Sequence, residues 1–125
     1  MQTIARCGTN DLPRARVFYD PLAALLGAAT AFSTDKLVAY KGPTGGMFMI
    51  GLPFAGEANF GNGTQFCLKA PDQETVEAAY AKALELGGTS EGEPGFRGPK
   101  AQTLYACYFR DLDGNKLMVY SSPHM

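Results

Sequence analysis

Apolar and polar residues alternate along the chain in a pattern that predicts several short strands and two helices. Helical spacing of apolar residues follows Asp11 and Asp72, and each aspartate is placed to cap its helix at the N-terminus. Glycine is expected to end these helices, at Gly27 and at Gly88. Strands are expected at Gln2–Thr9, Leu37–Lys41, Met47–Leu52, Thr64–Ala70, Leu104–Asp111 and Lys116–Ser121.

Glycine and proline mark the expected breaks between these elements. Two long loops are predicted, from Pro53 to Gly63 and over Glu91–Lys100. The tripeptide Asp113-Gly114-Asn115 is a hairpin signal between the last two strands. Pro21 lies inside the first helical pattern and predicts a kink or a break near Asp20.

The two halves of the chain repeat each other. A shift of 61 positions places Asp11 on Asp72 and Gly27 on Gly88. The last strands of the halves match at a larger shift, about 69, because Glu91–Lys100 adds residues. The chain is therefore expected to form a strand-helix-strand-strand-strand unit twice, which is an α+β architecture.

Composition narrows the possible functions. The 125 residues are 46% apolar, which suits one domain with a hydrophobic core. The net charge of −1 gives no electrostatic argument for binding nucleic acid or an anionic membrane. No apolar run approaches the roughly 20 residues of a membrane-spanning helix, and the first residues lack the apolar core of a signal peptide.

Few residues of this chain are typical of nucleophilic or metal chemistry. The single histidine, His124, is next to last and is expected to lie in a solvated tail. The cysteines, Cys7, Cys67 and Cys107, have no CxxC spacing and predict free thiols in a reducing cytoplasm. All three are expected to be buried and inert. Asp111 and Asp113 are interpreted as turn formers rather than as a catalytic carboxylate pair.

Several short motifs follow one another along this repeat. They are NDL with ARVFYD at 10–20, LG at 26–27, FGNGT at 60–64, GG at 87–88, EPGFR at 93–97 and FRDLDGNKL at 109–117. In this order they resemble the vicinal-oxygen-chelate superfamily, which includes glyoxalase I, bleomycin-resistance proteins and extradiol dioxygenases. The resemblance covers nearly the whole chain. It implies two βαβββ modules, at about residues 1–57 and 58–125 of a single domain, whose sheets curve around a cleft in a homodimer.

The resemblance also identifies the positions where family members with a metal carry its ligands. Those positions hold Ile4 and Gln65 on the first strands of the modules, and Met49 and Met118 on the last strands. Isoleucine offers no ligand atom, and the methionine thioether is a poor ligand for Zn²⁺, Ni²⁺, Mn²⁺ or Fe²⁺. We therefore expect no metal and no other cofactor, and an apolar patch with one amide in the cleft.

Three further residues are candidates for contact with a ligand. Arg6 follows Ile4 by two residues, so both are expected to face the same side of their strand. If that side is the cleft, the guanidinium there would bind a carboxylate or a phosphate. Arg97 is expected on a loop over the cleft, and Tyr120 shares a strand face with Met118. Each residue also has a purely structural interpretation, as a solvated cation or a packed ring.

The function expected from these residues is metal-independent binding of a small apolar or aromatic molecule, in an inter-module or dimer cleft. The alternative is a glyoxalase-like lyase, isomerase or oxygenase whose active site has an atypical metal or none, with Tyr120, Arg6 or Arg97 as candidate catalytic groups. A third interpretation is a family member that acts through protein contacts after its cleft has collapsed. The expected partners are a small molecule and a second copy of the chain, with no nucleic acid and no membrane.

Overall fold

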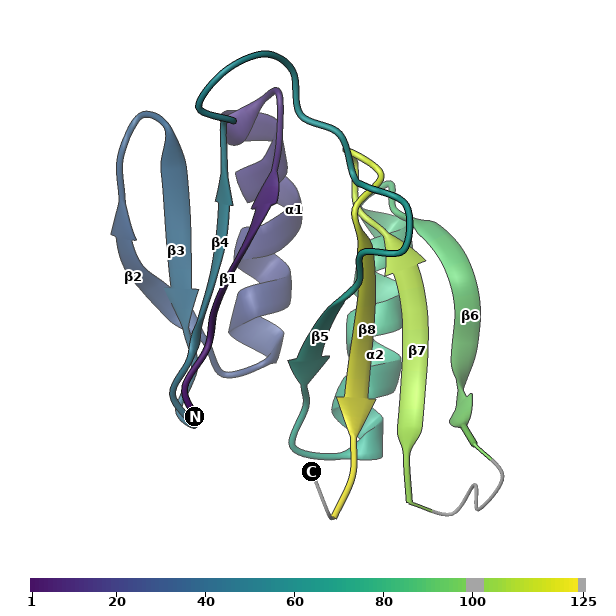
Figure 1. The fold of residues 1–125 in the computed structure, drawn as a ribbon. Helices are drawn as coiled ribbons and strands as arrows, with labels where there is room; N and C mark the ends of the chain where they lie inside the picture. Colours follow the sequence, from purple (N-terminus) through teal and green to yellow (C-terminus); the bar gives the residue numbers. More distant parts are fainter. Residues whose placement is uncertain (99–102, 124–125) are drawn as a thin grey trace.

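Two strand-helix-strand-strand-strand units follow each other in the computed structural model, which describes residues 1–98 and 103–123 (Figure 1). The first contains β1 (Ile4–Gly8), α1 (Leu12–Leu25), β2 (Ala29–Ser33), β3 (Leu37–Lys41) and β4 (Met47–Gly51). The second contains β5 (Phe66–Lys69), α2 (Gln73–Glu85), β6 (Thr89–Phe96), β7 (Tyr105–Arg110) and β8 (Lys116–Ser121). The predicted fold class of two βαβββ modules is confirmed.

The repeat extends to the pairing of the strands. Each module forms a four-stranded sheet, with the order β1-β4-β3-β2 in the N-terminal sheet and β5-β8-β7-β6 in the C-terminal sheet. In both, the first and last strands run parallel, with Ile4 opposite Met47 and Phe66 opposite Leu117. A shift of 61 moves Ile4 to position 65, and a shift of 69 moves Met47 to position 116. These two positions directly precede Phe66 and Leu117, the corresponding pair of the second module. The two modules therefore share the register of their first and last strands as well as the order of their elements.

The predicted helix caps are present. Asp11 accepts a hydrogen bond from the backbone N–H of Arg14 at 3.1 Å, and Asp72 accepts one from Thr75 at 2.8 Å. These bonds satisfy amides that have no acceptor inside the helix. After α1, Gly27 takes a φ of 74°, a left-handed conformation that glycine adopts without a steric penalty.

The break expected at Pro21 does not occur, and α1 is continuous from Leu12 to Leu25. Proline removes one N–H that would bond the carbonyl of Val17, but Val17 is on an exposed side of the helix where water can serve instead. Phe18 and Leu22, on either side of this step, are both buried in the core. Packing against the sheet therefore holds the helix together across the proline.

The loop predicted over Glu91–Lys100 is wrong for most of its length, because β6 covers Thr89–Phe96. This strand is the edge of its sheet, and its register against β7 shifts between Ser90 and Gly92 and again between Gly92 and Gly95. Glycine and proline are tolerated at an edge strand with such irregularities. Residues 99 and 100 of this segment, like His124, lie outside the described residues.

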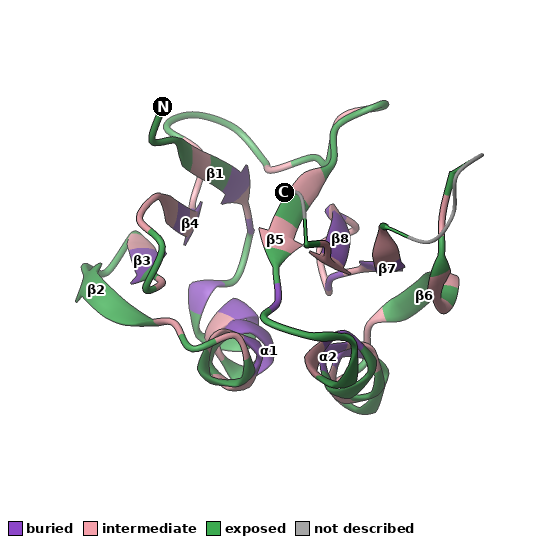
Figure 2. Ribbon diagram, turned by 90° about the horizontal axis from the view of Figure 1, so that it is seen from below, coloured by how far each residue is buried: buried purple, intermediate pink, exposed green. Residues whose placement is uncertain are grey.

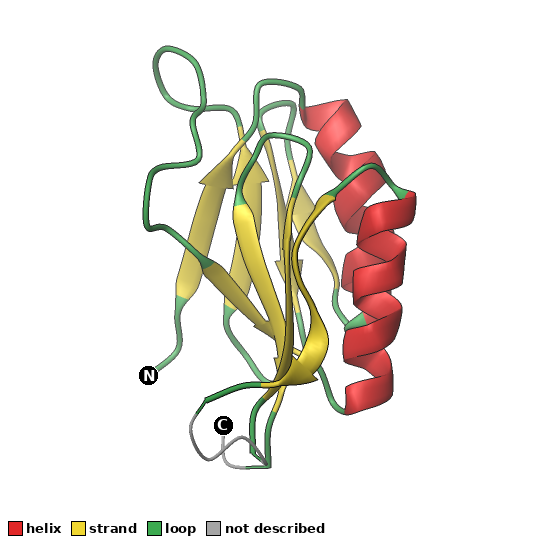
Figure 3. Ribbon diagram, turned by 90° about the vertical axis from the view of Figure 1, so that its right-hand side faces the viewer, coloured by secondary structure: helices red, strands yellow, loops and turns green. Residues whose placement is uncertain are grey.

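The helices and sheets form two layers. Figure 3 shows both helices along one side of the strands, and Figure 2 shows α1 and α2 side by side beneath the arch of the two sheets. Alternate strand residues point at the helices and form one core shared by both modules. Its largest fully buried members are Phe18, Phe109, Ile50, Leu117, Val38, Val76 and Val119. None of the helices in the described part of the chain is long and apolar enough to cross a membrane.

The remaining strand residues point away from the helices, and we call these two surfaces the outward faces. The two sheets share no hydrogen-bonded strand pair. Strands β1 and β5 are the inner strands of the arch, and the sheets slope away from them toward β2 and β6 (Figure 2). The outward faces of one chain therefore diverge instead of facing each other.

Candidate functional site

Three of the predicted site residues share the outward face of the N-terminal sheet. Ile4 is 65% exposed, and Arg6 lies two residues farther along β1, as the alternation predicts. Met49 lies opposite Arg6 on β4 and is half-buried. The Arg6 guanidinium donates from Nη2 to the carbonyl of Leu52 at 2.6 Å, which holds it against the end of β4. This part of the face thus presents the exposed Ile4 and the half-buried Met49 beside the guanidinium of Arg6.

Three other predicted site residues share the outward face of the C-terminal sheet. Gln65 comes directly before β5, and its Nε2 lies 3.6 Å from the sulfur of Cys67. Met118 on β8 lies opposite Cys67, and Tyr120 lies opposite Lys69. Met118 is only 7% exposed, although it lies on the outward face.

The positions of the implied metal ligands therefore fall into two separate groups. Ile4 and Met49 lie on one sheet, whereas Gln65 and Met118 lie on or beside the other. Because the outward faces diverge, a single chain does not close a cleft over all four. No group of three or more His, Cys, Asp or Glu side chains that could hold a metal occurs within residues 1–98 and 103–123.

The seventh predicted residue, Arg97, directly follows β6 and lies over an aromatic ring. Its Cζ is 5.4 Å from the centroid of Tyr108, a distance that allows a cation–π interaction. Its Nη2 donates to the carbonyl of Glu93, whereas its buried Nε has no hydrogen-bond partner among the described residues. Tyr108 lies opposite Met118 on the neighbouring strand, so Arg97 belongs to the same outward face.

A groove of about 1140 Å³ separates the two modules on the side of α1. Gln65 and Tyr120 line it, but the other five predicted residues do not. Its apolar lining includes Leu22, Leu26, Phe48, Phe66 and Leu68. The sequence marks these residues only as members of helix and strand patterns, so sequence reasoning missed the groove.

A second, smaller cavity of about 190 Å³ lies at the start of β5 and β8, and we call it the polar pocket. Its lining residues are Asn62, Gly63, Thr64, Gln65, Arg110 and Lys116. Of these, only Gln65 is a predicted site residue. The predicted hairpin around Gly114 was the one sequence feature that pointed to this pocket, because a hairpin there brings Arg110 and Lys116 onto neighbouring strands.

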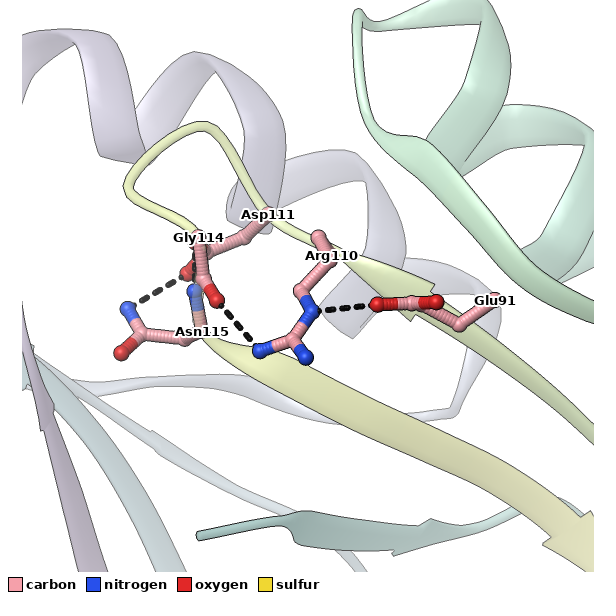
Figure 4. Close-up of polar contacts among 5 residues, drawn as sticks. All are labelled: Glu91, Arg110, Asp111, Gly114 and Asn115. Atoms are coloured by element: carbon pink, nitrogen blue, oxygen red, sulfur yellow. Dashed lines mark hydrogen bonds and ion pairs between the residues drawn. The ribbon is translucent and has the colours of Figure 1, made fainter. Parts of the chain in front are cut away.

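Asp111 is a buried turn former that also joins the two modules. Its carboxylate accepts a hydrogen bond from the backbone N–H of Asn115 at 2.8 Å (Figure 4). It also accepts one from the backbone N–H of Asp113 at 2.9 Å, as expected for a turn. It also accepts a bond from the hydroxyl of Tyr19 on α1 at 2.5 Å. Burial raises the pKa of Asp111, and these hydrogen bonds act in the opposite direction. The interpretation as a turn former is confirmed.

The cysteines do not share one environment. Cys7 and Cys107 are buried, and burial raises the pKa of the thiols to about 12 and about 11 respectively. The prediction that all three thiols are buried is wrong for Cys67, which is exposed. Cys67 lies on the outward face of β5, an edge strand, while its neighbours Phe66 and Leu68 pack toward the core.

Comparison with known proteins agrees with this fold. The chain is 34% identical to a glyoxalase/bleomycin resistance protein from Albidiferax ferrireducens T118, with 96% of this chain and 97% of that chain covered and a TM-score of 0.86. A glyoxalase-related enzyme from Fulvimarina pelagi shares the fold at 17% identity, with 98% and 88% of the two chains covered and a TM-score of 0.74. So does a lactoylglutathione lyase from Agrobacterium tumefaciens at 22% identity, with 97% and 92% covered and a TM-score of 0.66.

No family model and no curated protein matches the sequence. The resemblance to the vicinal-oxygen-chelate superfamily is nevertheless confirmed by the solved structures. With about a third of its residues identical to those of the Albidiferax protein over nearly the full length of both, the chain belongs to the glyoxalase/bleomycin resistance protein family.

Proposed function

We propose that this protein binds a small apolar or aromatic molecule on its outward faces without a metal ion. The observation that carries the proposal is the character of the four positions at which the resemblance places metal ligands. They hold Ile4, Met49, Gln65 and Met118, which provide apolar surface and one amide. The 65% exposure of Ile4 leaves apolar surface open to water, and covering such surface is favourable.

We further propose that a homodimer completes the binding cleft. In one chain the outward faces diverge, so each lacks an opposing wall. A second copy related by twofold symmetry would bring the N-terminal sheet of one chain against the C-terminal sheet of the other. Ile4, Arg6 and Met49 would then line the same cleft as Gln65, Met118 and Tyr120, and Arg97 would lie at its edge.

The experiment that tests this function is titration of EDTA-treated protein with 2-naphthol, a neutral aromatic probe, followed by fluorescence. Saturable binding is expected, and added Zn²⁺, Ni²⁺ or Mn²⁺ should leave the affinity unchanged. Ile4→Gln should weaken binding about tenfold, because an apolar contact surface is lost at the outward face. In sedimentation the wild-type protein is expected as a dimer.

Ala24→Gln is the matched control, because it introduces the same side chain at an exposed helical position that lines the inter-module groove. It should bind 2-naphthol as the wild-type protein does. Loss of binding in Ala24→Gln but not in Ile4→Gln would place the ligand in the groove and contradict binding on the outward faces. A requirement for a divalent ion would contradict the metal-independent function.

A further inference from the structure

The polar pocket has a lining suited to an anion. Two cationic side chains, Arg110 and Lys116, line it together with the amides of Asn62 and Gln65. Gly63 and Thr64 complete the lining, so no carboxylate is among the residues that surround the cavity. Guanidinium, ammonium and amide N–H groups are the donors that bind carboxylate and phosphate oxygens.

Strand register places the two cations side by side. Arg110 on β7 lies directly opposite Lys116 on β8, and both belong to the outward face. Like charges at directly opposite positions of a sheet repel each other and destabilise the pair. Glu91 offsets part of this charge through an ion pair of 2.6 Å with Nε of Arg110. Lys116 forms no ion pair with a described residue, and its Nζ lies 5.6 Å from the centroid of the Tyr108 ring.

The guanidinium of Arg110 is held in place while part of it stays available. Figure 4 shows Nε bonded to Glu91 and Nη1 donating to the carbonyl of Gly114. The bond to Gly114 is 3.0 Å long. The ring of Phe60 lies against the same group, with 5.3 Å from Cζ to the ring centroid. The remaining nitrogen, Nη2, has no hydrogen-bond partner among the described residues. An anion that binds here would meet a donor whose orientation is already set, which reduces the entropic cost of binding.

An apolar surface adjoins these cations. The next pair along the same two strands is Tyr108 and Met118, which lie opposite each other on the outward face. Tyr108 is half-buried and Met118 is only 7% exposed, so Tyr108 presents most of the accessible apolar surface of this pair. Gln65 connects the polar pocket to this surface, because it lines the pocket and precedes Cys67, the strand partner of Met118. A ligand could therefore place a ring against Tyr108 and an anionic group in the pocket.

We propose that the polar pocket binds the oxyanion of the ligand, so that the ligand class is an aromatic or apolar acid carrying a carboxylate or a phosphate. This inference rests on the proposed function, because it assigns the charged end of the molecule whose apolar body the outward faces hold. Arg110, Lys116 and Gln65 contact the oxyanion, and Tyr108 contacts the body. Since the contacts are charge-assisted and partly exposed, the affinity falls as ionic strength rises.

The test compares 2-naphthoate and 2-naphthyl phosphate with neutral 2-naphthol by titration at low ionic strength. At least one of the two anions should bind about tenfold tighter than 2-naphthol, as expected for a charge-assisted contact. The better anion identifies the group that the pocket prefers. Lys116→Gln should remove the advantage of the anion and leave the affinity for 2-naphthol unchanged. Gln65→Glu, at an exposed position, should likewise remove the advantage of the anion, because it places a negative charge in the pocket.

Lys82→Gln is the matched control, because it removes the same charge from an ion pair on α2, away from the pocket. It should retain the preference for the anion. Equal binding of anions and 2-naphthol, or an equal loss of preference in Lys82→Gln and Lys116→Gln, would overturn the inference. Binding of 2-naphthol without any preference for anions would overturn this inference and still support the proposed function. Binding of inorganic phosphate at the pocket, with no binding of 2-naphthol, would support the pocket and contradict the proposed function.

Discussion

The hydroxyl of Tyr19 donates a hydrogen bond of 2.5 Å to Oδ2 of Asp111, and this bond joins α1 of the first module to the β7–β8 turn of the second. From the same turn, Nδ2 of Asn115 donates to the carbonyl of Gly8 at 2.9 Å. These contacts lie within the core shared by the two modules, where unmade hydrogen bonds are costly. They therefore help to set the orientation of one sheet relative to the other, and with it the divergence of the outward faces.

Removing the Tyr19 hydroxyl should destabilise the protein. Tyr19→Phe leaves a buried carboxylate without one of its donors, and the expected loss is about 1–3 kcal/mol in the free energy of unfolding. Urea unfolding followed by circular dichroism measures this loss. Tyr40→Phe is the control, because its hydroxyl also donates at 2.5 Å, to Asp20, but at a partly exposed site. A loss in Tyr40→Phe as large as in Tyr19→Phe would contradict the special role of the inter-module bond.

Gly114→Ala should destabilise the hairpin for two reasons. Gly114 has a φ of 86°, which alanine adopts only with strain, and an added Cβ would lie 2.9 Å from Cδ1 of Phe60. The expected loss is about 2 kcal/mol or more in the free energy of unfolding. Gly56→Ala separates the two contributions, since Gly56 also has a positive φ, 73°, but nothing lies within 4 Å of its added Cβ. Equal losses in a thermal unfolding experiment would show that the contact with Phe60 has no effect.

The three thiols should differ in reactivity. The exposed Cys67 is expected to react with a maleimide in the folded protein at neutral pH, and Cys7 and Cys107 only after unfolding. Intact-mass measurement should therefore show one adduct in native buffer and three in denaturant. In Cys67→Ser the native protein should remain unlabelled. Native labelling of this variant at the rate seen in the wild-type protein would contradict the burial of the other two.

Stability should fall at alkaline pH, in part because of Cys7. In the unfolded chain this thiol loses its proton near its ordinary pKa of 9.0, whereas burial raises the pKa to about 12 in the folded protein. The folded state therefore binds more protons between these values, and the free energy of unfolding decreases as pH rises through this window. The contribution of Cys7 is on the order of a few kcal/mol.

Urea unfolding at a series of pH values from 8 to about 11 tests this linkage. The Cys7→Ala variant should show a shallower decrease than the wild-type protein. It should not become independent of pH, since burial also raises the pKa of Cys107 and of Tyr19. Parallel curves of the unfolding free energy against pH for the variant and the wild-type protein would contradict a contribution from Cys7.

Local sequence patterns predicted most of the secondary structure correctly. They failed where packing or strand pairing with residues distant in sequence overrode the local preference. The Asp11 and Asp72 caps and the Gly114 hairpin depend only on residues close in sequence, so the local sequence was enough to predict them. The break at Pro21 was predicted from the helix alone, but packing on both sides of the proline keeps α1 continuous. The strand β6 was predicted as a loop because its glycines and proline disfavour strands, and its pairing with β7 overrides that preference.

The sequence by itself determined the two βαβββ modules, because these follow from short-range patterns and a repeat. The family resemblance, and not a local pattern, identified the four positions that hold Ile4, Met49, Gln65 and Met118. The sequence also determined that Ile4 and Arg6 share one strand face. Only the tertiary structure decided that the two sheets turn their outward faces apart, and that Arg110 and Lys116 line a polar pocket with Gln65. The physical reason is that one core, shared by both modules and joined by Tyr19 and Asp111, sets how the sheets pack. That packing depends on contacts between residues distant in sequence, which no local pattern encodes.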